Sequence, residues 1–235
     1  MITPLMKSYF ITATDTGVGK TTVTSALAAC MQKLGINVGV MKPVAIGIAQ
    51  KTGFKSSDVS ILYRAVKVND SEDDINPIFM PSPISPYDAS KVLDLKFDKK
   101  IIFEKFTKLQ SRHDMMLVEG IGGILTPLSR DYFVADLIKE MSLETIIVTR
   151  ATLGTLNHTM MTVNTCHDRK IPITGIIVNN YDENAGLAEK NAPITLHEIT
   201  GIPILGVLPF VKDYENTAAM IPHVEKNIDL KSLIF

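Results

Sequence analysis

Short apolar segments alternate along this chain with longer segments of helical length. The apolar segments carry few polar residues and lie at positions 8–13, 37–42, 115–119, 145–150, 173–180 and 204–209. A strand that is apolar throughout, without alternation, is typical of a sheet that is covered on both faces. The pattern therefore predicts an α/β fold in which a mostly parallel sheet has helices on both faces.

The segments between these strands predict helices and one irregular region. Helices are expected at residues 20–34, 58–65, 155–168 and 185–200, and a further helix should begin after Asp98. Four prolines in residues 67–97 leave room only for short elements there. The chain has no linker, repeat or low-complexity block, so we expect one domain over residues 1–235.

The first predicted strand runs into the loop "ATDTGVGKTT", residues 13–22. The strict phosphate-loop pattern G-x-x-x-x-G-K-[ST] requires glycine where this chain has Thr14. Gly17 and Gly19 still permit backbone N–H groups to turn toward phosphate, and a helix begins near Lys20. Lys20 would then reach the β- and γ-phosphates, and the Thr21 hydroxyl would bind Mg²⁺. The alternative is a plain turn between strand and helix with an exposed lysine.

A carboxylate ends another apolar strand, at residues 115–119. Glu119 could bind Mg²⁺ directly or through water, or it could simply cap a helix or face solvent. Three glycines in the following "EGIGG" permit close approach of a ligand, which a capping residue does not need. Both loops follow strand ends, and open α/β sheets bind their ligands at the carboxyl ends of the strands.

Composition narrows the choice of partners and of compartment. The net charge of −1 gives no electrostatic basis for a nucleic-acid or anionic-membrane partner. No apolar run approaches the roughly 18 residues of a membrane span, and the N-terminus does not resemble a signal peptide. Cys30 and Cys166 lie far apart and match no metal-binding spacing, which favours a reducing compartment. We therefore expect a cytoplasmic protein.

Five segments together carry a resemblance to a known family. "TATDTGVGKT", "MKPVAIG", "VEGIGGILTPL", "LGTLNH" and "VNN" resemble dethiobiotin synthetases in order and spacing, over nearly the whole chain. The loop of that family also lacks the glycine at Thr14, although it begins with glycine where this chain has Ala13. The resemblance implies a P-loop NTPase fold and a ligase of biotin synthesis. Its substrates would be 7,8-diaminononanoate, CO₂ and ATP, and its products dethiobiotin, ADP and phosphate.

The resemblance also implies a role for each matching residue. ATP binding is implied for Gly17, Val18, Gly19, Lys20, Thr21, Thr22, Asp58, Glu119, Gly120, Ile121, Gly122, Asn179, Asn180, Pro209, Phe210 and Val211. Mg²⁺ binding is implied for Thr21, Asp58 and Glu119, and catalysis for Lys42 and Lys20. Asp58 by itself would be interpreted as an N-terminal residue of a helix.

Substrate contacts are implied for Lys42, Ile46, Gly154 and Asn157. Gly154 and Asn157 match a segment that meets substrate across a dimer interface, so the resemblance implies a homodimer. The family commonly has serine or threonine at Ile46, which follows a predicted strand end here. Ile46 has no hydroxyl, so that contact must be absent, moved or made by backbone.

Two other functions share parts of this pattern. Partition-type ATPases have a signature lysine five residues before the loop lysine, where this chain has Asp15. Cobyrinate-type amidation enzymes usually extend into a glutaminase domain, whereas this sequence stops at Phe235. A binding module without catalysis would not need two metal-binding positions. The synthetase is therefore the favoured function.

Overall fold

In the computed structural model, which describes residues 7–182, 184–213 and 215–234, a parallel sheet of six strands lies at the centre. The strand order is β10-β9-β8-β1-β5-β2, with β1 in the interior and β2 at one edge. The bounds are Tyr9–Ala13 for β1, Val38–Met41 for β2, Met115–Glu119 for β5, Glu144–Arg150 for β8, Ile173–Tyr181 for β9 and Ile204–Pro209 for β10. Each apolar segment predicted to be a strand is therefore a strand of this sheet.

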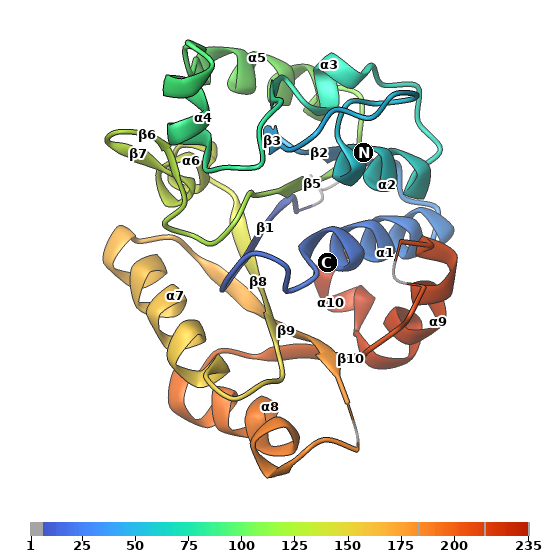
Figure 1. Ribbon diagram of the computed structural model, residues 1–235. Coiled ribbons are helices and arrows are strands. Elements are labelled where there is room, and N and C mark those ends of the chain that lie inside the picture. The colour runs from blue at the N-terminus through green and yellow to red at the C-terminus, as the bar shows by residue number, and fades with distance from the viewer. Residues whose placement is uncertain (1–6, 183, 214, 235) are drawn as a thin grey trace.

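Helices cover the sheet on both faces, as the continuous apolar strands predicted (Figure 1). One hydrophobic cluster lies under α1 (Lys20–Lys33), α2 (Ser57–Ala65), α9 (Thr217–Asn227) and α10 (Leu230–Ile234). A second lies under α5 (Lys99–Gln110), α6 (Val134–Met141), α7 (Thr155–Arg169) and α8 (Leu187–Thr200). Neighbouring residues of β1 point to opposite clusters, Phe10 to the second and Ile11 to the first.

The region at residues 67–97 contains three short elements that the sequence did not locate. They are α3 (Glu72–Ile75), β4 (Ile78–Met80) and α4 (Pro86–Val92). Strand β4 pairs with another unpredicted strand, β3 (Val44–Ile46), outside the main sheet. The prolines did restrict this region to short elements, and the predicted cap of α5 is confirmed, because Asp98 accepts a hydrogen bond from the Lys100 N–H.

Some elements were not predicted at all. These are the helices α6, α9 and α10 and the small antiparallel hairpin of β6 (Pro127–Ser129) and β7 (Tyr132–Phe133). Within the described residues, no helix combines the length and the apolar character needed to cross a membrane. Cytoplasmic placement stays a prediction.

The order of the strands determines where a ligand can bind. The chain passes from β1 to the edge strand β2 in one direction and reaches β8 on the other side of β1. Ligands of open α/β sheets bind at the carboxyl ends of strands near such a reversal. The loops after β1, β2 and β5 all leave the sheet at the carboxyl ends of the strands, on the same side, since β5 pairs in parallel with both β1 and β2.

Candidate active site

A cavity of about 890 Å³ lies over these strand ends. Most of the residues expected to bind ATP, metal or substrate line it: Gly17, Gly19, Lys20, Thr21, Thr22, Lys42, Ile46, Asp58, Ile121, Gly122, Asn180 and Phe210. Residues from at least six separate segments of the sequence therefore meet in one cavity.

The loop between β1 and α1 has the backbone shape that a phosphate site needs. Gly17 and Gly19 have φ angles of 74° and 95°, which are left-handed values that other residues rarely adopt. A Cβ atom on Gly19 would lie 2.1 Å from Nδ2 of Asn179, so a side chain does not fit there. Asn179 also donates a hydrogen bond to the Val18 carbonyl (3.0 Å) and so holds the loop from β9. Helix α1 begins at Lys20 and directs its N-terminal N–H groups toward the cavity.

Lys20 is almost fully buried at the wall of the cavity. Its ammonium donates to the Gly122 carbonyl at 2.7 Å and to the Asp15 carbonyl at 3.4 Å. Burial and the nearby positive charge of Lys42 lower the pKa of Lys20 to about 8. An anion that enters the cavity would raise the pKa of Lys20 again, because a full negative charge stabilises the ammonium more than the partial charges of the two carbonyl groups do.

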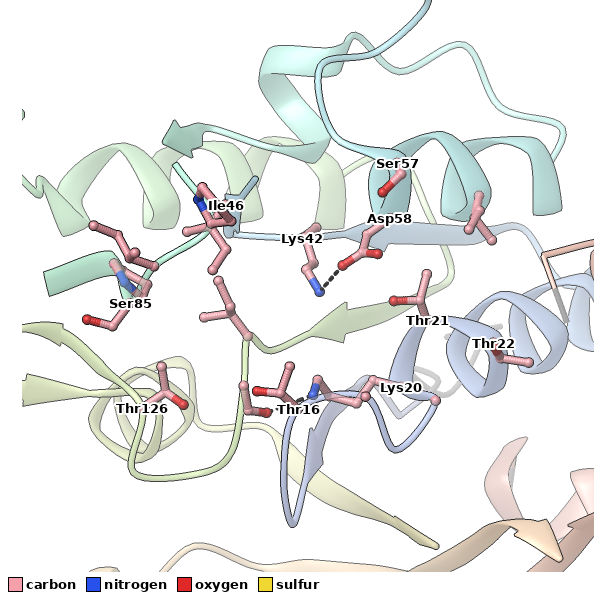
Figure 2. Close-up of a pocket in the computed structure, with 18 of the residues that line it drawn as sticks. Thr16, Lys20, Thr21, Thr22, Lys42, Ile46, Ser57, Asp58, Ser85 and Thr126 are labelled. Atoms are coloured by element: carbon pink, nitrogen blue, oxygen red, sulfur yellow. Dashed lines mark hydrogen bonds and ion pairs between the residues drawn. The ribbon is translucent and has the colours of Figure 1, made fainter. Parts of the chain in front are cut away.

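Two carboxylates and one hydroxyl lie together beside this loop. Glu119 is fully buried, and its Oε1 accepts hydrogen bonds from Thr21 Oγ1 at 2.8 Å and from Lys42 Nζ at 2.5 Å. Asp58 comes from the first turn of α2, and its Oδ2 lies 3.0 Å from Lys42 Nζ. Figure 2 shows the side chains of Lys42, Asp58 and Thr21 directed toward one another, with Lys20 nearby at the start of α1.

Lys42 is the cation that compensates these carboxylates. It follows the last residue of β2, its side chain is 3% exposed, and it also donates to the Gly120 carbonyl at 3.1 Å. Burial alone would lower the pKa of Lys42, but Glu119 and Asp58 outweigh burial and raise it. The same Lys42 charge lowers the pKa of Asp58. Lys42 is therefore a firmly protonated ammonium whose charge faces the cavity.

The donor set beside Lys42 is chemically suited to Mg²⁺. The second oxygen of Glu119, Oε2, is buried, and no hydrogen-bond partner for it lies among the described residues. Buried polar atoms are nearly always paired, so this oxygen is available to a ligand. The described part of the chain has no group of three or more His, Cys, Asp or Glu side chains that could hold a metal. Two carboxylates and a hydroxyl suit Mg²⁺, which keeps several waters and shares phosphate ligands.

A second cavity, of about 540 Å³, extends the first one. Asn180 and Phe210 line both cavities, and Pro209 and Tyr181 line the second. Of the pair expected to contact the base, only Asn180 faces a cavity, since Asn179 is buried and holds the loop. Val211 packs against the first hydrophobic cluster. A planar base could lie beside Phe210, which is 62% exposed.

Two expected substrate residues lie outside both cavities. Gly154 precedes α7, and Asn157 is in its first turn, and both are exposed. Near them Leu153 is 86% exposed and Met161 is 59% exposed.

Ile46 follows the end of β2, as expected, but it is also the last residue of the unpredicted short strand β3, where it pairs with Met80. The sequence also missed several residues of the cavity wall, chiefly Ile61, Pro83, Ile84, Ser85, Thr126 and Pro127. Residues 83–86 were predicted only to be irregular, and nothing in their pattern indicates a site.

Comparison with known proteins first defines the class. Residues 7–218 match a protein-family profile described as an AAA domain. A ParA family ATPase from Chlorobium tepidum covers 94% of this chain and 92% of its own, with a TM-score of 0.53 and 18% identity. The cell division protein MinD from Aquifex aeolicus covers 97% of this chain and 93% of its own, with a TM-score of 0.56 and 18% identity. At such identities the likeness shows the fold alone, which is that of the P-loop ATPases.

Relatives of known sequence then define the family. A protein named ATP-dependent dethiobiotin synthetase BioD from Nitrosopumilus maritimus is 51% identical over 97% of this chain and 100% of its own. Proteins of the same name from Thermodesulfovibrio yellowstonii and Bacillus subtilis are 42% and 36% identical, and each covers at least 93% of this chain. The chain belongs to the dethiobiotin synthetase family.

Proposed function

We propose that this chain closes a cyclic urea on 7,8-diaminononanoate, using CO₂ and ATP, and releases dethiobiotin, ADP and phosphate. Membership of the family supports the reaction. The observation that carries the proposal for this chain is that Lys20, Lys42 and Asp58 line one cavity, while buried Glu119 accepts a hydrogen bond from Lys42. Each charge in that group has a use in transferring phosphate to an anionic acceptor.

The chemistry requires three steps. One amine adds to CO₂ and loses a proton, which gives a carbamate. A carbamate oxygen then attacks the terminal phosphorus of ATP, forming a mixed anhydride and releasing ADP. The second amine attacks the carbamoyl carbon, the C–O bond to phosphate breaks, and a second proton leaves the nitrogen. Phosphate is a far better leaving group than the carbamate oxygen itself, so the reaction needs ATP.

The protein contributes position and charge to these steps. The loop backbone and Lys20 would hold the phosphates, and Lys42 would lie between the carbamate and the terminal phosphate, two anions that repel each other. Thr21, Asp58 and Glu119 would hold Mg²⁺, which neutralises phosphate charge when it is bound. Burial of Lys20, Lys42 and Glu119 excludes water and strengthens each of these interactions.

ADP release tests the proposal against its main rival. The fold is shared with ParA and MinD proteins, so an ATPase that switches a protein partner is the second candidate. A synthetase should release ADP only when both the diamine and bicarbonate are present, with one ADP for each dethiobiotin formed. ADP release that is independent of both would overturn the proposal and favour the switch ATPase.

We also propose a homodimer. It is supported by the exposed apolar residues Leu153 and Met161 beside Gly154 and Asn157, which the family resemblance associates with substrate. Light scattering at the assay concentration should give twice the 25.8 kDa of the chain. Replacing Leu153 by glutamate should lower that mass and the activity together, whereas the same change at the exposed Val92 should alter neither. An active wild-type enzyme that is only monomeric would contradict the proposal.

Ile46→Ser should fold and should not raise the KM for the diamine. Ile46 lines the cavity, so a serine hydroxyl there would restore the group common in the family. Its side chain is partly buried against the second hydrophobic cluster, so a modest loss of unfolding free energy is expected. Ile48→Ser is the matched control, because Ile48 is 86% exposed. A large rise in diamine KM for Ile46→Ser alone would show that the isoleucine itself contacts the substrate.

A further inference from the structure

The backbone of Lys42 is held from one side by two consecutive residues. The Lys42 N–H donates to the Ile75 carbonyl at 2.8 Å. The Lys42 carbonyl accepts a hydrogen bond from Nδ2 of Asn76 at 2.6 Å. Both polar backbone groups of Lys42 are thus bound to the C-terminal end of α3, which consists of Ile75 and the C-cap residue Asn76.

These two hydrogen bonds take the place of those that a neighbouring strand would make to Lys42. Strand β2 is at the edge of the sheet, and its pairing with β5 ends where Met41 lies opposite Val118. Lys42 is the next residue, and Pro43 after it has no N–H to donate. The sheet alone therefore does not fix the direction in which Lys42 leaves the strand, and Ile75 and Asn76 supply the missing hydrogen bonds.

The side-chain nitrogen of Asn76 uses both of its N–H groups in hydrogen bonds to the backbone. Its Nδ2 also donates to the Ile78 carbonyl at 3.1 Å, so both N–H bonds of the amide point at carbonyl oxygens. Asn76 is buried, and its Oδ1 is left without a hydrogen-bond partner among the described residues. Burying an oxygen without a hydrogen-bond partner is unfavourable. The two hydrogen bonds donated by Nδ2 offset this cost, and they are the reason that asparagine suits this position.

The segment that carries Asn76 is itself anchored. Asp74 is 1% exposed, and its carboxylate lies 2.8 Å from Lys105 Nζ and 2.6 Å from Lys108 Nζ, both in α5. The N–H of Asp74 also donates a hydrogen bond to Oγ of Ser71, the N-cap residue of α3. The backbone of Lys42 is therefore held in place through α3 by α5, in addition to its connection to β2.

We propose that Asn76 is a positioning residue that acts through Lys42. It fixes the backbone of Lys42 so that the ammonium lies between Glu119, Asp58 and the cavity. The proposal rests on the role given to Lys42 in the proposed function. A displacement of about 1 Å in a reacting group can cost about a hundredfold in rate, so a small backbone shift at Lys42 is enough.

A double-mutant cycle tests this inference. Asn76→Ala should lower kcat by about tenfold to a hundredfold with little change in the KM for ATP, because Lys20 and the loop still bind the nucleotide. In a Lys42→Ala background, the same change should alter kcat by less than about twofold, because the group that it positions is already gone. Asn76→Asp keeps the size of the side chain but loses both N–H donors, so it should behave like Asn76→Ala.

Asn37→Ala is the matched control. Asn37 directly precedes β2, and its Nδ2 donates to the Arg112 carbonyl at 2.7 Å, so it makes a comparable bond at the opposite end of the strand. We expect it to leave kcat unchanged. Thermal unfolding of every variant would define an assay temperature at which all are folded.

Each outcome decides the question. Full activity of Asn76→Ala, or equal losses of kcat in the two backgrounds, would overturn the inference while leaving the role of Lys42 intact. If Lys42→Ala itself has normal kcat, then the role of Lys42 fails and this inference fails with it. If neither Asn76 variant folds, Asn76 is a determinant of folding rather than of turnover, and the inference is wrong.

Discussion

Replacing Lys42 by alanine should lower kcat by about 10²–10³, the scale of losing one preorganised electrostatic contact in a site that excludes water. The Lys42 ammonium is buried, protonated and directed at the cavity by two carboxylates. The carbamate and the terminal phosphate are both anions, and their repulsion rises as they approach. Alanine removes the charge that would offset it, and steady-state kinetics would measure the loss.

The variant set for Lys42 separates catalysis from folding. Removing one partner of a buried ion pair can cost about 3–5 kcal/mol of stability, so the unfolding midpoint must be measured with each rate. Lys42→Met keeps most of the stem and should show the same loss of kcat. Lys42→Arg should recover only part of it, because a planar guanidinium does not replace a compact ammonium. Lys33→Ala, at an exposed surface pair with Glu225, is the control.

ATP binding provides the second measurement on Lys42. Lys20 and the loop backbone are in place without it, so nucleotide affinity, measured by calorimetry, should survive in Lys42→Ala. A Lys42→Ala enzyme that folds and turns over at the normal rate would remove this residue from the catalytic group. A loss of nucleotide affinity with normal kcat would instead make Lys42 a binding residue.

The sequence was sufficient to predict the six strands of the central sheet but not which strands pair with each other. Six buried strands were visible as apolar runs, because a strand covered on both faces needs apolar residues at every position. The pairing of β1 with both β5 and β8 is a long-range property that no local pattern contains. Helix α6 was missed although it is apolar on one side, because it is only eight residues long and follows a hairpin directly.

The candidate site was predictable to a similar and limited extent. Glycines and charged residues at strand ends indicated the loop and Glu119, because their chemistry is local. Asp58 needed the family resemblance, since an aspartate after serine is typical of any helix start. Asn76 gave no signal in the sequence, because its function depends on a carbonyl 34 residues away in the chain.

Loss of an oxygen from the proposed metal site should have the other large effect. Losing a mere supporting contact of a metal site typically costs about 10–100-fold in affinity, so losing a direct ligand should raise the Mg²⁺ concentration for half-maximal rate at least about tenfold. We expect this for Thr21→Val, which keeps the shape of the side chain, and for Glu119→Gln. The rate as a function of Mg²⁺ concentration, at saturating ATP, is the measurement.

The two variants should differ in folding, and this difference makes the test sharper. Thr21→Val removes one hydrogen bond to Glu119 at the cavity wall, so its unfolding midpoint should change little. Glu119→Gln also removes a charge that pairs with buried Lys42, so it should lose more stability. If both variants need a similarly raised Mg²⁺ concentration for half-maximal rate although their stabilities differ, then the change arises at the metal site and not from a loss of folding. Thr165→Val, at an exposed hydroxyl on α7 that donates to the Met161 carbonyl, is the control. Normal rates at limiting Mg²⁺ in both Thr21→Val and Glu119→Gln would contradict the assignment of these oxygens to the metal.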